Sequence, residues 1–200
     1  MRKSHRAISI ASAVWVVAGL SAQQPKSNPA GTAATTPAAA RTPAAPAGFT
    51  VVASIQEIMS GIVDPTSKVL FGAVAVEATQ AGTKTKAPET AADWEVVRRN
   101  ALMLAEAGNL LKIPGRRAER AGSQNKAPSP ENLTPAEIQA AIARDTASYN
   151  KLAQGLTDAA LVTLKAIDAR NPDAVSSAGE NIDTACENCH LRFWYPPKKK

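Results

Sequence analysis

The chain has 200 residues, of which 44% are hydrophobic but only 4% aromatic, so it can build one modest globular domain. Its formal net charge of +6 comes from 23 Lys and Arg against 17 Asp and Glu. Three of these positive charges lie together at Lys198–Lys200. Such a small excess of positive charge does not indicate a nucleic-acid-binding protein, because that class concentrates basic residues on one face or in one groove.

The N-terminus has the pattern of a secretory signal peptide. Residues 1–6 are mostly polar and basic, residues 7–20 form an apolar run that is short for a membrane span, and small residues follow at Ser21 and Ala22. We therefore predict a signal peptide over residues 1–22 and export to the periplasm. An uncleaved membrane anchor is the alternative. Cleavage would lower the net charge from +6 to +3.

The next segment, residues 23–48, is dominated by Ala, Pro, Thr, Gly and Ser. It cannot bury enough apolar surface to offset the entropy of ordering, so we predict a disordered linker. The folded domain is expected over residues 49–195, followed by a basic tail over residues 196–200. Within the domain the apolar periodicity is helical, and no strand-like alternation stands out.

The first predicted helix carries one apolar stripe, formed by Val52, Ile55, Met59 and Ile62. Asp64 and Pro65 follow this stripe. Pro65 either kinks the helix or begins a new one at the N1 position, with Asp64 as its cap. The pattern then resumes at Val69, Ala73 and Val76, and a polar loop covers residues 80–88.

The second predicted helix begins at Thr90, because Thr90 and Asp93 have the spacing of a capping pair. Its inward positions are Trp94, Val97, Ala101, Leu104 and Leu111. Residues 113–115 end the helix with Pro and Gly, and residues 116–132 form a long polar loop.

The third predicted helix has the clearest start, with Thr134 as N-cap, Pro135 at N1 and Glu137 at N3. Leu133 and Ile138 can form the flanking hydrophobic staple. The stripe continues as one long helix up to residues 171–172, through Ile138, Ile142, Tyr149, Leu152, Leu156, Ala159, Thr163 and Ile167.

Asn171 can cap a fourth helix with Pro172 at N1. The inner face of this helix holds Val175, Ala178, Ile182, Ala185, Cys186, Cys189 and Phe193. Four helices with uneven connections predict an all-α fold, an antiparallel four-helix bundle. The Ala-rich faces leave a thin core, which a large apolar cofactor between the helices would fill.

The last predicted helix contains a C-x-x-C-H sequence over residues 186–190, the attachment signal of haem c. At ~100° per residue, Cys189 and His190 fall within about 60° of Cys186 on the helix. One face therefore presents two thiols to the porphyrin vinyl groups and an imidazole to the iron. We predict one covalent haem c, with thioether bonds at Cys186 and Cys189 and with His190 as the proximal iron ligand.

The other uses of such a motif fit less well. A structural zinc site needs four Cys or His ligands, whereas the exported chain would keep Cys186, Cys189 and His190, because His5 lies in the signal peptide. A redox dithiol needs the N-terminus of a helix after a strand. A disulfide between residues three apart would close too short a loop to stabilise the fold much.

A helical bundle whose C-x-x-C-H motif lies near the C-terminus resembles the class II c-type cytochromes, the cytochrome c-prime group, most closely over residues 178–193. The resemblance implies a four-helix bundle with haem at one end, His190 on one side of the iron and a first-helix residue on the other. That residue is Met in low-spin members and apolar in high-spin members. Met59 lies where this Met is expected, and ordinary core packing is the alternative. The interruption at residues 64–65 is a departure from the family pattern.

These observations predict an electron carrier of the periplasm that works with a redox partner protein and is not an enzyme. The alternative is a five-coordinate haem protein that binds nitric oxide or carbon monoxide. We expect the protein not to bind nucleic acid. It would be attached to a membrane only if the signal peptide stays uncleaved, and a homodimer is possible. Trp94 and Tyr149 are expected in the core. Four arginines are expected on the solvated surface, although they could also bind the haem propionates: Arg98, Arg99, Arg116 and Arg117.

Overall fold

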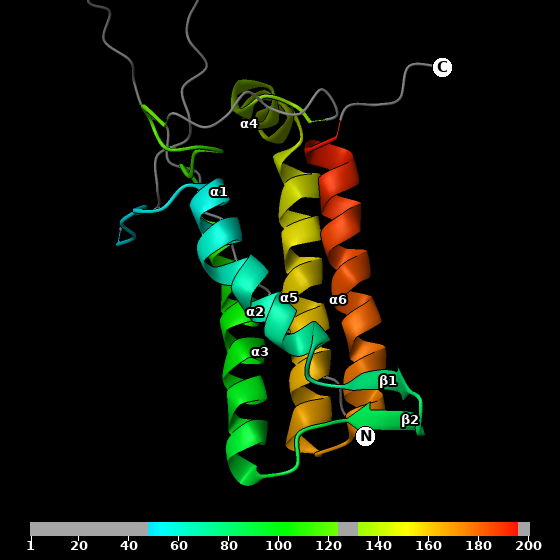
Figure 1. The fold of residues 1–200 in the computed structure, drawn as a ribbon. Coiled ribbons are helices and arrows are strands. Elements are labelled where there is room, and N and C mark those ends of the chain that lie inside the picture. Colours follow the sequence, from blue (N-terminus) through cyan, green and yellow to red (C-terminus); the bar gives the residue numbers. More distant parts are fainter. Residues whose placement is uncertain (1–47, 124–131, 196–200) are drawn as a thin grey trace, which may run out of the picture. The chain divides into compact units, whose positions relative to one another are not determined.

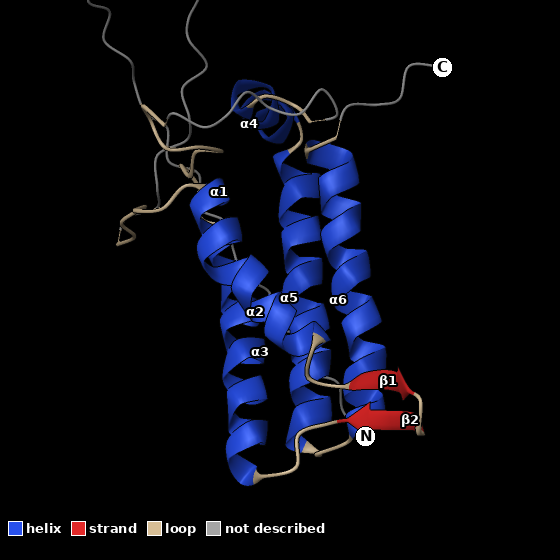
Figure 2. Cartoon of the chain, in the orientation of Figure 1, coloured by secondary structure: helices blue, strands red, loops and turns tan. Residues whose placement is uncertain are grey.

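The computed structural model describes residues 48–123 and 132–195. The predicted signal peptide, nearly all of the predicted linker, the basic tail and part of the long loop therefore lie outside the described residues. The described part is mainly helical and has one small two-stranded antiparallel sheet (Figures 1 and 2). This confirms the helical class and corrects the expectation that strands are absent. No helix in the two described segments is long and apolar enough to cross a membrane.

The first helical stretch consists of α1 (Ile55–Ile58), a π-helical turn η1 (Met59–Val63) and α2 (Asp64–Phe71). Ser54 caps it through a capping box with Glu57, so Val52 lies before the helix and is 89% exposed, contrary to the prediction. Helical geometry continues through Pro65, which lies in the first turn of α2, and the residue that precedes this helix is Val63 rather than the predicted cap Asp64.

The π-turn explains how the stretch continues past Pro65. The N–H of Asp64 donates to the carbonyl of Met59, five residues earlier. Pro65 has no N–H, and its ring would crowd the carbonyl one α-helical turn earlier, so a wider turn directly before it accommodates the ring. The extra residue also shifts the buried face, and the buried positions of α2 are Thr66, Ser67 and Leu70.

A β-hairpin occupies the segment where Val76 was predicted to extend the first helix and where a polar loop was predicted after it. Strand β1 (Ala75–Thr79) pairs antiparallel with β2 (Gly82–Lys86), and Gly82 has a φ of +120°, which favours glycine. Val76 is 70% exposed in β1. Because almost every residue of the hairpin is exposed, its sequence lacks the apolar alternation that identifies a half-buried strand.

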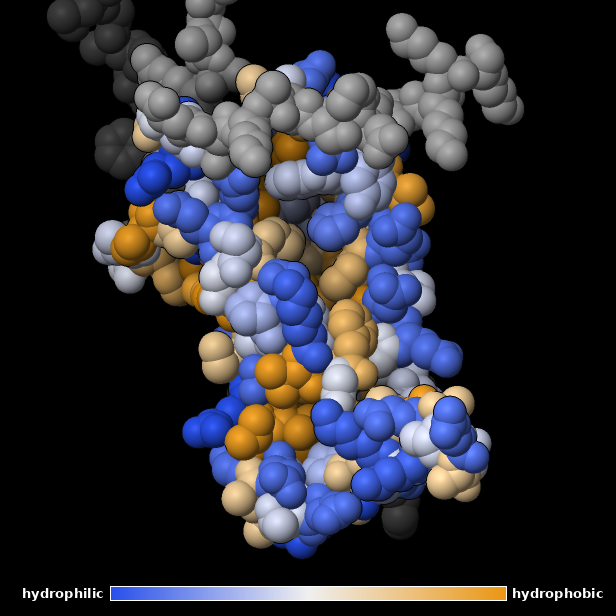
Figure 3. Space-filling view, viewed as in Figure 1, coloured by the Kyte–Doolittle hydropathy of each residue, from blue (hydrophilic) through white to orange (hydrophobic). Residues whose placement is uncertain are grey.

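Helix α3 (Ala91–Leu111) begins as predicted, with Thr90 and Asp93 in a reciprocal capping box. Each of its five predicted inward residues is buried. The helix packs mainly against α5 and α2. On the face drawn in Figure 3, an apolar patch lies near α2 and the lower part of α3. Val69 of α2 and Val96 of α3 are exposed and line one shallow pocket.

The predicted long third helix is two helices, α4 (Pro135–Arg144) and α5 (Thr146–Asp168). The start at Thr134 and Glu137 is confirmed. The break comes at Asp145, whose backbone leaves helical geometry (φ −142°, ψ 57°) and whose carboxylate accepts from the N–H of Ser148. Figure 1 shows α4 nearly end-on beside the start of α5, so the two axes cross.

Helix α6 (Pro172–Phe193) begins at the predicted cap Asn171, whose side chain accepts from the N–H of Ala174. It packs along α5, which in turn packs along α3, and α2 contacts both α3 and α6. The most deeply buried apolar residues of these helices include Ala101, Leu104, Ala107, Ala160 and Ile182. Helix α1, helix α4 and the C-terminal end of α6 all lie at one end of the structure, as Figure 1 shows.

Candidate functional site

Cys186 and Cys189 lie in the C-terminal half of α6, one turn apart. Both thiols are free and half-buried, and both side chains pack against the hydrophobic core. Burial raises the pKa of Cys186, and the nearby carboxylates of Asp183 and Glu187 act in the same direction. Burial, with Cys186 as a smaller influence, raises the pKa of Cys189 to about 11. Reactive redox dithiols lie at helix N-termini and have low pKa values. The position of this pair in the C-terminal half of α6 and its raised thiol pKa values are therefore not those of a redox dithiol.

His190 directly follows the second thiol and is also half-buried. Its ring lies 6.2 Å from the ring of Trp194 and 6.1 Å from that of Tyr195, measured between centroids. Burial lowers the pKa of His190, although the carboxylate of Glu187 opposes this shift. The neutral imidazole, which is the form that binds a metal, is therefore favoured at neutral pH.

The chain around His190 is fixed to the junction of α4 and α5. Arg192 donates to the carboxylate of Asp145 over 2.8 Å, and the N–H of Leu133 donates to the carbonyl of Trp194 over 2.8 Å. Phe193 is buried, and its ring meets that of Tyr149 edge to face, with 5.5 Å between centroids. These three contacts could not be predicted from local patterns, because each joins residues at least 44 positions apart.

Met59 is the first residue of the π-turn. It is half-buried and packs against the same core as Cys186 and Cys189. Single π-helical turns are frequent at functional sites. Helix α6, however, contacts the first helical stretch chiefly through α2 rather than through the π-turn. Met103 is 48% exposed on α3 and so lies outside the core.

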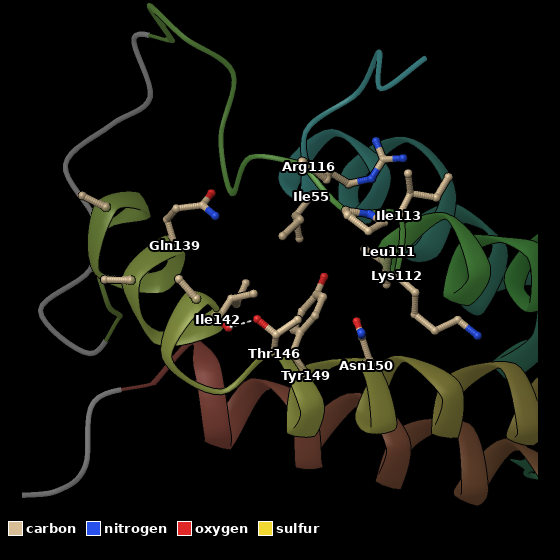
Figure 4. A pocket seen from close by; sticks show the side chains of 15 residues that line it. Ile55, Leu111, Lys112, Ile113, Arg116, Gln139, Ile142, Thr146, Tyr149 and Asn150 are labelled. Atoms are coloured by element: carbon tan, nitrogen blue, oxygen red, sulfur yellow. Dashed lines mark hydrogen bonds between the residues drawn. The ribbon is translucent and has the colours of Figure 1, made fainter. Parts of the chain in front are cut away.

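A cavity of about 400 Å³ lies at the same end of the structure, between the start of α1, the end of α3, helix α4 and the start of α5 (Figure 4). The Tyr149 hydroxyl points into this cavity, between Ile55, Leu111 and Ile142 (Figure 4). This hydroxyl is buried and has no hydrogen-bond partner among the described residues, and burial raises the pKa of Tyr149. The prediction that Tyr149 lies in the core is confirmed.

Arg116 lines the same cavity and is only 7% exposed, so the expectation of solvated surface is wrong for this arginine. Its guanidinium donates to the carbonyl of Leu110 over 2.9 Å and to the carbonyl of Ala53. Burial lowers the pKa of Arg116. Of the three other arginines considered, Arg98 pairs with Asp168 over 2.8 Å, and Arg99 and Arg117 are exposed.

The residues present fit a haem c on two observations. The two thiols are unpaired and packed against the core beside a half-buried imidazole. At the same end, the buried phenol of Tyr149 has no partner within the described ranges, and the buried guanidinium of Arg116 borders a cavity. Within the described ranges, no three His, Cys, Asp or Glu side chains group as ligands for a metal ion. No family model, curated protein or solved structure gives a match to the chain.

Proposed function

We propose that this protein is a class II c-type cytochrome that carries single electrons in the periplasm. In this proposal, the stretch from α1 to α2 forms an antiparallel four-helix bundle with α3, α5 and α6. The observation that carries the proposal is the C-x-x-C-H motif, because its two unpaired thiols pack against the core from the last helix with an imidazole next to them.

Each residue of the motif has a distinct role in this proposal. The thiols of Cys186 and Cys189 would hold the haem covalently, because each S–H can add across one vinyl group of the porphyrin and form one thioether bond. The imidazole of His190 would bind the iron as the proximal ligand, and the contacts of Arg192 with Asp145 and of Phe193 with Tyr149 hold its helix in place. When bound, the haem supplies one-electron chemistry between ferric and ferrous iron.

Whether a residue binds the iron opposite His190 distinguishes the two candidate functions, electron transfer and gas binding. We propose Met59 as the distal ligand, because it packs against the core and is the first residue of the π-turn. A saturated iron would then suit electron transfer to a redox partner protein. The second candidate, a five-coordinate protein that binds nitric oxide or carbon monoxide, is favoured by one observation: α6 contacts the first helical stretch chiefly through α2, away from Met59.

The experiment that tests the proposal is haem staining of the full chain after export to a periplasm that matures c-type cytochromes. We expect a stained band that survives boiling in denaturant, because thioether bonds are covalent. A protein with non-covalent haem, run alongside, loses its stain under the same conditions. An exported chain that folds and never stains contradicts the proposal.

Replacing Met59 with alanine is expected to abolish the red ferric absorption band of Met–iron ligation and to lower the reduction potential, because a thioether ligand favours ferrous iron. Optical spectra and redox titrations of the holoprotein measure both effects. Met103→Ala is the matched control, because Met103 is exposed. A high-spin spectrum that Met59→Ala leaves unchanged, with carbon monoxide bound by the ferrous wild type, would instead support the gas-binding function.

A further inference from the structure

Two buried polar side chains at this cavity need further partners: the Tyr149 hydroxyl needs a hydrogen-bond acceptor, and the Arg116 guanidinium needs a negative charge. Tyr149 is 6% exposed, and in the described part of the chain its hydroxyl has no hydrogen-bond partner. Burying a hydroxyl without a partner is unfavourable. Arg116 carries five N–H donors in its guanidinium, and its partners among the described residues are two backbone carbonyls. Arg98 and Arg192 each pair with a carboxylate, but no described carboxylate pairs with Arg116.

The Tyr149 hydroxyl is bonded to none of the other polar side chains that line the cavity. Three of them have partners of their own: Lys112 donates to the side chain of Gln154, the amide oxygen of Gln139 accepts from the N–H of Ala118 over 2.7 Å, and the Thr146 hydroxyl donates to the carbonyl of Ile142 over 2.9 Å. The volume of about 400 Å³ is far larger than the space of one water molecule, about 30 Å³. The cavity therefore has room for a larger group with an acidic end.

We infer that this cavity receives a propionate of the haem, with the Tyr149 hydroxyl donating a hydrogen bond to its carboxylate and Arg116 balancing its charge. The inference rests on the proposed cytochrome function. One carboxylate supplies both the acceptor and the negative charge, and charge-assisted hydrogen bonds are the stronger kind. The apolar walls at Ile55, Leu111 and Ile142 suit the hydrocarbon part of the same group.

The position of Tyr149 connects the cavity with the attachment site. Its ring contacts Phe193, which lies one helical turn after Cys189 on the same face of α6. A haem fixed at Cys189 would thus lie near the side chain whose hydroxyl points into the cavity.

The test is resonance Raman spectroscopy of the holoprotein, in which the propionate bending band reports hydrogen bonding to the carboxylate. Tyr149→Phe removes only the hydroxyl and keeps the ring contact with Phe193, so it preserves the fold. We expect the band to move to lower frequency in Tyr149→Phe and in Arg116→Gln. Lys112→Gln, which changes a charge at the same cavity, is the matched control and should leave the band unchanged.

The outcomes separate the inference from the proposed function. If the wild type attaches no haem, the proposed function fails and the inference fails with it. If haem is attached but the band is the same in wild type and Tyr149→Phe, the propionate site is wrong while the cytochrome stands. Because Arg116 also donates to Leu110 and Ala53, Arg116→Gln can disturb the loop. Tyr149→Phe is therefore the deciding variant.

Discussion

Replacing Cys186 and Cys189 together with alanine is expected to abolish covalent haem completely. The chain contains only these two cysteines, so no other thiol can form a thioether bond. Haem staining after denaturing electrophoresis, together with the intact mass of the protein, measures the loss. We also expect the variant to melt at a lower temperature than the holoprotein, because a cofactor bound to the folded state stabilises it.

Single variants give the graded control for this result. Cys186→Ala and Cys189→Ala each leave one thiol beside His190, so each should retain a weaker covalent stain. Met103→Ala removes an exposed sulfur-containing side chain and should attach haem like the wild type. Haem that remains covalently bound in the double variant would show that the attachment lies at another residue, and the assigned site would have to be abandoned.

Replacing Gly108 with alanine is expected to destabilise the protein by about 1–3 kcal/mol, the usual range for an overpacked core. Gly108 lies where α3 crosses close to α5. A Cβ there would approach the Thr157 hydroxyl most closely and would lie 2.9 Å from the carbonyl oxygen of Ala153. The Thr157 hydroxyl cannot turn away freely, because it donates to the buried carbonyl of Ala105 over 3.1 Å. Chemical denaturation followed by circular dichroism measures the change.

Gly155→Ala provides the matched control for this packing effect. Gly155 lies inside α5, and a Cβ at this position would meet nothing within 4 Å. Alanine is favoured over glycine inside a helix by about 1 kcal/mol, so this variant should be as stable as the wild type or more stable. If Gly108→Ala matches Gly155→Ala in stability, the close approach of α3 and α5 is wrong.

Helix starts were predictable from the sequence because a cap is a local interaction. Thr90 with Asp93 and Thr134 with Glu137 each satisfy backbone N–H groups within one turn, and Asn171 does so with its own side chain. No contact with a distant segment is needed for these bonds. The same locality places Cys186 and Cys189 on the core side of one helix, because their spacing and the helical repeat set their direction.

The break at Asp145 shows why local patterns were not enough for the third predicted helix. The apolar stripe runs through it without interruption, but Asp145 accepts from Ser148 and pairs with Arg192 of α6. The second of these partners is 47 residues away. Likewise, Pro65 is compatible with a kink or with a new helix, and its environment in the structure selects a π-turn that begins at Met59.

The two parts of the candidate site were therefore predictable to different degrees. The motif at residues 186–190, on which the proposed function rests, could be recognised from the sequence, because all of its residues lie in one short stretch of a single helix. The cavity with Tyr149 and Arg116 could not, because α1, α3, α4 and α5 all contribute to its walls. Arg116 is buried through a bond to the carbonyl of Ala53, 63 residues earlier. Burial and missing partners arise from such distant contacts, which exist only once the chain has folded.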